Sequence, residues 1–189
     1  MKKGFLSDLS EEDREIVEYG VSQGVVLLIG MISAIVMGIL LKIPGKAILF
    51  LACSYYLRIY AGGYHAKTQF RCSVFSALAT FLCFLWLKYV VLPQVILHAL
   101  SLVAGVFVVV FAPIDNENRK LEEIEKKVYS KKVKTIVLVE SVIYVISVLL
   151  KWNSVYYCIN LSMIFVAASM LMGMTCRKMR GNCDENIIM

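Results

Sequence analysis

Long apolar stretches separated by short charged segments dominate the chain. Six of these stretches approach the roughly 20 apolar residues that a helix needs to cross a bilayer. They cover residues 21–41, 43–61, 73–91, 94–113, 133–151 and 155–174. All three prolines, Pro44, Pro93 and Pro113, fall at the ends of stretches, where a missing backbone N–H costs little. The pattern predicts an all-α polytopic membrane protein with six transmembrane helices.

Composition supports a membrane environment. Hydrophobic residues make up 59% of the chain, against about 45–50% in ordinary globular domains. The segment 10–15 is acidic where a secretory signal would be basic, so we expect residues 1–20 to form a short cytoplasmic or interfacial helix. We expect one membrane domain over 1–189, with a six-span core at 21–174, and no nucleic-acid partner.

The distribution of lysine and arginine predicts the orientation. With a cytoplasmic N-terminus, 16 of the 20 basic residues lie inside and four lie outside, at Lys42, Lys46, Lys88 and Lys151. The positive-inside rule therefore favours an N-in, C-in multi-pass protein of the cell membrane. Residues 175–189 then form a cytoplasmic tail. The charged segment 115–134 is also cytoplasmic, as either a solvated helix with Glu–Lys pairs or a peptide-docking surface.

Reactive side chains concentrate between the second and third stretches, in residues 58–72. His65 and Cys72 lie here, on the cytoplasmic side, where thiols stay reduced. Lys67, Arg71 and the start of the third span all favour a thiolate at Cys72, and His65 supplies a base. The segment therefore predicts a Cys–His dyad on the cytoplasmic face, although His65 and Cys72 could also be ordinary interfacial residues.

The spacing of the dyad makes a structural demand. Seven residues of continuous helix would separate the two side chains by roughly 10 Å, so we expect the helix to break between His65 and Cys72. Gly62 and Gly63, just upstream, allow the chain to turn. Backbone N–H groups near Cys72, or the Gln69 side chain, could stabilise an oxyanion.

Two acidic residues remain as candidates for a supporting role in the site. Asp115 could orient His65 as a distant third member, or could serve only the loop. Glu140 lies inside the fifth stretch, where an ionisable group is costly, and it could face substrate or pack between helices. A metal at His65 and Cys72 would need two further ligands at metal-like spacing, and the sequence supplies none. We expect no cofactor.

The order and spacing of Arg58, Gly62-Gly63-Tyr64-His65-Ala66 and Cys72 resemble the signature of the accessory gene regulator B family of Gram-positive quorum-sensing systems. Glu18-Tyr19-Gly20 and Ala112-Pro113-Ile114-Asp115-Asn116 also look like features of that family. The resemblance implies a membrane cysteine endopeptidase that cuts a propeptide on the C-terminal side of its signal region. The propeptide's own cysteine, or a serine in some members, then closes a thiolactone or lactone ring.

Carried over by motif, the resemblance implies that Cys72 is the nucleophile and His65 its base, with Arg58 and Gly63 in supporting positions. The expected partners are a propeptide with an amphipathic leader and an acidic tail, the lipid bilayer and, given the small size, a second copy of the chain. A non-catalytic peptide transporter or export channel and a membrane scaffold are the alternatives.

Overall fold

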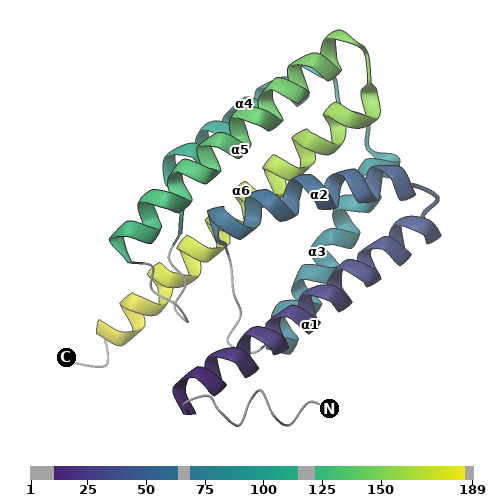
Figure 1. The fold of residues 1–189 in the computed structure, drawn as a ribbon. Helices are drawn as coiled ribbons and strands as arrows, with labels where there is room; N and C mark the ends of the chain where they lie inside the picture. Colours follow the sequence, from purple (N-terminus) through teal and green to yellow (C-terminus); the bar gives the residue numbers. More distant parts are fainter. Residues whose placement is uncertain (1–10, 64–68, 115–121, 186–189) are drawn as a thin grey trace.

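Six α-helices make up most of the chain in the computed structural model, which describes residues 11–63, 69–114 and 122–185 (Figure 1). Each helix coincides with one of the six apolar stretches, so the all-α prediction is confirmed. The helices are α1 (Glu11–Leu40), α2 (Pro44–Ala61), α3 (Gln69–Tyr89), α4 (Gln94–Phe111), α5 (Glu123–Leu149) and α6 (Asn153–Glu185).

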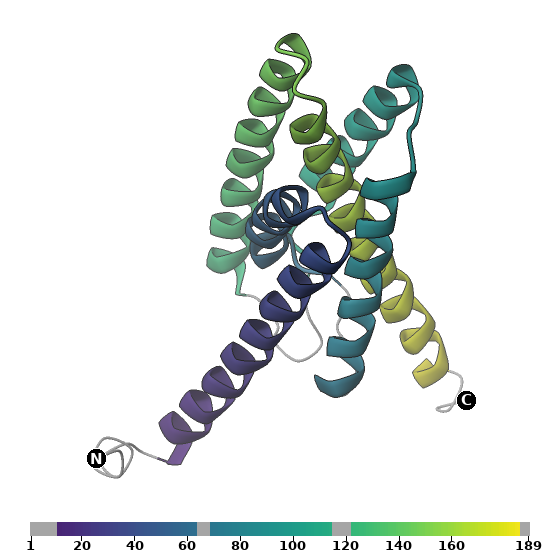
Figure 2. The ribbon, with the colours of Figure 1, turned by 90° about the vertical axis from the view of Figure 1, so that its right-hand side faces the viewer.

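The helices pack as two groups joined by α2. Helices α4, α5 and α6 contact one another, and α1 contacts α3. Helix α2 packs against α1 and also against α5 and α6, and it crosses between the two groups at a steep angle (Figures 1 and 2). The C-terminal end of α2 is therefore surrounded by elements from the second half of the chain.

Aromatic contacts connect the two hydrophobic clusters of the interior. Phe50 of α2 is fully buried and meets Phe84 of α3 and Phe165 of α6 edge-on, with ring centroids 5.8 Å and 5.7 Å away. Each such pair adds about 0.5–1.5 kcal/mol beyond the burial of area. Phe165 packs against both clusters, so it lies where the two helix groups meet.

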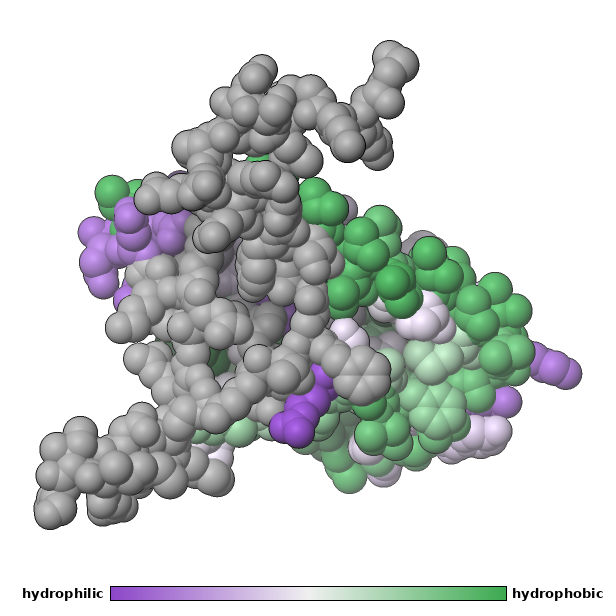
Figure 3. Space-filling view, turned by 90° about the horizontal axis from the view of Figure 1, so that it is seen from below, coloured by the Kyte–Doolittle hydropathy of each residue, from purple (hydrophilic) through white to green (hydrophobic). Residues whose placement is uncertain are grey.

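The outer surface is apolar over a wide area. Among the described residues, Arg71–Tyr89, Gln94–Phe111 and Asn153–Cys176 are long and apolar enough to cross a membrane, and Gly24–Leu40 is a shorter apolar helix. Figure 3 shows a broad apolar surface on one side of the molecule, with hydrophilic residues at its margins. The chain is a polytopic membrane protein; that α2 and α5, which carry more ionisable groups, also cross stays a prediction.

Three helices extend beyond the predicted spans. The expected short N-terminal helix and the first span form one helix, α1, because no proline interrupts the chain from Glu11 to Leu40. Likewise α5 joins the charged segment before the fifth span to the span itself. Helix α6 continues to Glu185, so much of the predicted tail is helical.

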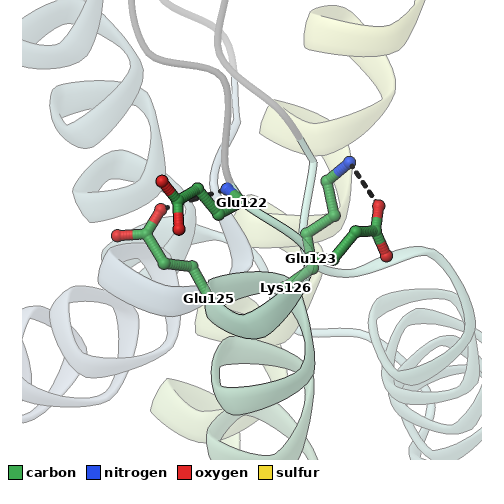
Figure 4. Close-up of polar contacts among 4 residues, drawn as sticks. All are labelled: Glu122, Glu123, Glu125 and Lys126. Carbon is green, nitrogen blue, oxygen red and sulfur yellow. Dashed lines mark hydrogen bonds and ion pairs between the residues drawn. The ribbon is translucent and has the colours of Figure 1, made fainter.

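The first turn of α5 is held by its own acidic residues (Figure 4). The backbone N–H of Glu122 donates to Oε2 of Glu125 at 3.2 Å, which satisfies one donor at the helix start. Lys126 Nζ lies 3.6 Å from Oε1 of Glu123, an i,i+3 pair of the kind that the sequence suggested.

Candidate functional site

The end of α2 is tied to the segment that follows α4. The backbone N–H of Ile114 donates to the carbonyl oxygen of Ala61 at 3.0 Å, and the Ala61 side chain is fully buried. Small residues allow this close approach between two backbones. Residues 61 and 114 are thereby fixed beside each other, although more than 50 positions separate them.

Gly62 and Gly63 continue this close packing just before the residues of the predicted dyad. Gly62 has φ +77°, and a Cβ placed there would lie 2.6 Å from the carbonyl oxygen of Ile114. Gly63 has φ +154°, and its Cβ would lie 2.5 Å from Oγ of Ser169 on α6. Both positions need glycine for its backbone conformation and for space. The turn that follows α2 is therefore packed between the segment after α4 and helix α6.

Arg58 links this turn to Cys72. The Arg58 side chain is partly buried, and its guanidinium carbon lies 5.6 Å from the ring centroid of Phe165, in cation–π geometry. The guanidinium also interacts electrostatically with Cys72. Cys72 is partly buried and is the fourth residue of α3. Arg71, its neighbour, is exposed.

A helix start and an arginine together favour negative charge at Cys72. The N-terminal end of a helix carries partial positive charge, which favours a thiolate. The Arg58 guanidinium adds a full positive charge on another element. The arrangement can therefore activate a thiol as a nucleophile.

Helix α5 covers another side of the end of α2. Lys132 Nζ lies 4.6 Å from the ring centroid of Tyr60 and donates to the Tyr60 hydroxyl at 3.4 Å. Tyr129 meets the same ring edge-on at 5.6 Å. These contacts place the positive charge of Lys132 beside Tyr60, which is two residues from Arg58 and two from Gly62 in the chain.

Several predicted site residues lie elsewhere or outside the described part. His65 and Asp115 fall outside the described residues, so the break between His65 and Cys72 and the role of Asp115 stay predictions. Gln69 is the first residue of α3. Ile114, the last described residue before Asp115, donates its backbone N–H to the carbonyl oxygen of Ala61.

Glu140 is not part of this group. Its side chain is 6% exposed, and Oε2 has no hydrogen-bond partner among the described residues. Its electrostatic neighbour on α2 is Cys53, which precedes Ala61 by eight residues or about 12 Å of helix. Glu140 thus lies farther along α2 from the glycine turn than Arg58 does.

Phe165 and Ser169 were not found by sequence reasoning. Both lie on an apolar helix about 100 residues away from the glycine turn, and nothing in their local pattern distinguishes them. Among the described residues, no three His, Cys, Asp or Glu side chains lie together in a group that could hold a metal ion.

Comparison with known proteins identifies the family. The profile described as Accessory gene regulator B (AgrB) matches residues 1–172. The chain belongs to the AgrB family. AgrB-like protein 2 of Clostridium perfringens strain 13 is 29% identical over 175 residues, which cover 87% of this chain and 82% of that protein. An AgrB-like protein of C. perfringens strain SM101 is 28% identical over 150 residues, or 75% and 70% of the two chains.

Membership confirms the resemblance drawn from the sequence. No solved structure matches the chain. The AgrB family is a peptidase family of the membrane that processes the propeptide of a quorum-sensing system. The matched range includes all six helices except the end of α6, and it contains Arg58, both glycines, Cys72 and Phe165.

Proposed function

We propose that the protein is an integral-membrane cysteine endopeptidase that cleaves a quorum-sensing propeptide on the C-terminal side of its signal region and promotes its cyclisation. Cys72 is the nucleophile and His65 its general base. The observation that carries this proposal is the position of Cys72 in the first turn of α3, within electrostatic range of the partly buried Arg58 guanidinium.

The first step forms a thioester. The Cys72 sulfur attacks the carbonyl carbon of the scissile peptide bond while His65 accepts the thiol proton. Backbone N–H groups at the start of α3, the Gln69 side chain or Arg58 stabilise the negative oxygen of the tetrahedral intermediate. His65 then gives its proton to the leaving nitrogen, and the C–N bond breaks. The signal region remains bound to Cys72 as a thioester.

The second step closes the ring. A cysteine thiol of the propeptide loses its proton to His65 and attacks the thioester carbonyl, and Cys72 leaves as thiolate. One thioester replaces another, so the exchange involves little change in bond energy, and it competes with hydrolysis only if water is kept away. The packing of Gly62 and Gly63 against Ile114 and Ser169 supports such a sheltered site.

Charge indicates which substrates the protein would attract. The chain has a net charge of +6, and most basic residues fall on the predicted cytoplasmic side, including Lys132 beside Tyr60. Such a face attracts acidic segments, while the apolar surface and bilayer suit an amphipathic leader. We therefore propose a propeptide with an amphipathic leader and an acidic tail, processed on the cytoplasmic face.

Co-expression with the propeptide encoded beside the gene tests the proposal. Mass spectrometry of the products should show cleaved, cyclic peptide with the unaltered protein and with Cys176→Ala, which removes an exposed thiol on α6. Cys72→Ala and His65→Ala should abolish cleavage. Cleavage that persists with Cys72→Ala would overturn the proposal and favour a transporter or export channel.

A further inference from the structure

One face of α6 supports the segment that carries the proposed chemistry. Phe165 and Ser169 are four residues apart, so they lie on the same side of the helix. Phe165 lies beneath the Arg58 guanidinium, and Ser169 lies against Gly63. Arg58 and Gly63 both belong to the end of α2 and the turn after it. Helix α6 therefore contacts the α2 end at two consecutive turns.

The ring of Phe165 is itself fixed in place. Its edge-on contact with Phe50, at 5.7 Å between ring centroids, joins it to a side chain with no exposed surface. Phe165 also packs against residues of both hydrophobic clusters. Because the Phe165 ring is packed on several sides, the face that it presents to Arg58 keeps a nearly fixed position.

Arg58 needs a group of this kind. An arginine side chain is long and flexible, and holding it in one place costs conformational entropy. The sequence has no acidic residue between Glu18 and Asp115, and α6 has none before Asp184, so neither α2 nor the adjoining part of α6 supplies a carboxylate. An aromatic face attracts a guanidinium without neutralising its charge. The charge then remains available to act on a neighbouring thiol.

We propose that Phe165 is a positioning residue, which holds the Arg58 guanidinium where its charge acts on Cys72. This inference rests on the proposed function, in which Cys72 is the nucleophile. Phe165 touches neither the substrate nor the reacting atoms and acts through Arg58. Loss of the ring lets the guanidinium move away from Cys72, so less of the thiol ionises at neutral pH.

The experiment measures how fast iodoacetamide alkylates Cys72 between pH 6 and pH 9.5 in the purified full-length protein, with mass spectrometry to follow each cysteine. Phe165→Leu should slow alkylation at pH 7 about three- to tenfold and move the rate–pH curve of Cys72 to higher pH. Phe165→Tyr keeps an aromatic face and should retain the original rate. Phe165→Met preserves most of the volume without a ring and should behave like Phe165→Leu.

Phe84→Leu is the matched control. Phe84 meets Phe50 in the same edge-on manner as Phe165, at 5.8 Å, and is fully buried. This change damages the core comparably and leaves the Phe165 ring beneath Arg58 in place. It should lower the thermal midpoint without moving the rate–pH curve of Cys72. An equal shift in Phe84→Leu would show a general effect of packing and would overturn the proposal.

A double variant shows whether Phe165 acts through Arg58. Arg58→Gln alone should slow alkylation of Cys72 as Phe165→Leu does, and the two changes together should be no slower than Arg58→Gln. Additive effects, or an unchanged curve in Phe165→Leu, would overturn the proposal. If Phe165→Leu fails to fold, Phe165→Met compared with Phe165→Tyr decides the question in the same way.

The outcome does not depend on peptide processing, whereas the proposed function fails only if Cys72→Ala still cleaves propeptide.

Discussion

The glycine pair after α2 is the most tightly constrained backbone of the described site. Gly62 and Gly63 have positive φ angles, and each faces atoms that a methyl group would meet at 2.6 Å or less. At Gly62 the opposing atom is a backbone carbonyl oxygen, which cannot rotate away as a side chain can. The conformation and the contact therefore both oppose any larger residue.

Replacing Gly62 with alanine should destabilise the protein by about 1–3 kcal/mol, because the residue is strained at φ +77° and collides with Ile114. Thermal unfolding in detergent measures the effect. Gly45→Ala, in the first turn of α2, is the control, since nothing lies within 4 Å of its added Cβ. Equal midpoints for the two variants would contradict the contact between Gly62 and Ile114.

Glu140, unlike the two glycines, is a position where substitution is expected to be tolerated. Its buried carboxyl oxygen Oε2 has no hydrogen-bond partner among the described residues. Its burial and the lack of a hydrogen bond to Oε2 among described residues favour the helix-packing alternative over a substrate-facing role. Glu140→Met removes the oxygens at similar length and should raise the free energy of unfolding by about 1–3 kcal/mol. Glu140→Gln keeps a polar group and should bring a smaller gain. A lower thermal midpoint in Glu140→Met would instead indicate that the carboxyl has a partner.

For single residues, the sequence indicated which side chains carry the proposed chemistry, but not which residues of α6 pack against them. Arg58, the two glycines and Cys72 stand out because of reactive or conformationally special side chains in one short segment. Phe165 and Ser169 could not be found in this way, because an apolar or small residue in an apolar helix has no distinctive local signal. Their importance depends on which helix face meets α2.

Helix α5 shows how local interactions stabilise the charged segment that precedes an apolar stretch. Its first turns are rich in charge, and the Glu122 N–H finds its acceptor in Glu125. The helix then continues into the apolar stretch without interruption. The position of Lys132 over Tyr60 depends on this continuity, since a loop there would not hold the lysine in a fixed register.

The contribution of the cap can be separated from that of charge. Glu125→Ala should increase hydrogen exchange in the first turn of α5 several-fold, which corresponds to a loss of roughly 0.5–1 kcal/mol. Glu123→Ala removes the same charge from the same turn but breaks only the exposed pair with Lys126, which is worth a few tenths of a kcal/mol. Similar exchange in both variants would show that charge at the helix start, and not the cap, matters.

At the scale of the whole molecule, orientation follows from the sum of the charges. In the described residues the starts of α1 and α3 and the end of α6 lie toward the lower side of Figure 1, whereas α2 runs across the middle of the molecule. Cys72, the fourth residue of α3, belongs to that lower side. The positive-inside count predicts that this side faces the cytoplasm.

Labelling with a membrane-impermeant maleimide in intact cells tests this orientation. Cys176, exposed near the end of α6, should react only after the membrane is permeabilised. A cysteine introduced by Ser154→Cys, exposed at the start of α6, should react in intact cells. The reverse pattern would place the site outside and contradict the proposed cytoplasmic processing.

The sequence by itself determined the position of six apolar helical stretches and the family, because bilayer-length apolar stretches and a reactive motif are local features. Tertiary structure alone decided that Ile114 meets Ala61, that Phe165 lies beneath Arg58 and that Glu140 lies deep between helices. These helices are apolar on more than one side, since some faces meet lipid and others meet protein. The hydrophobic pattern therefore shows that a helix is embedded, but the packing of complementary shapes decides which face meets which neighbour.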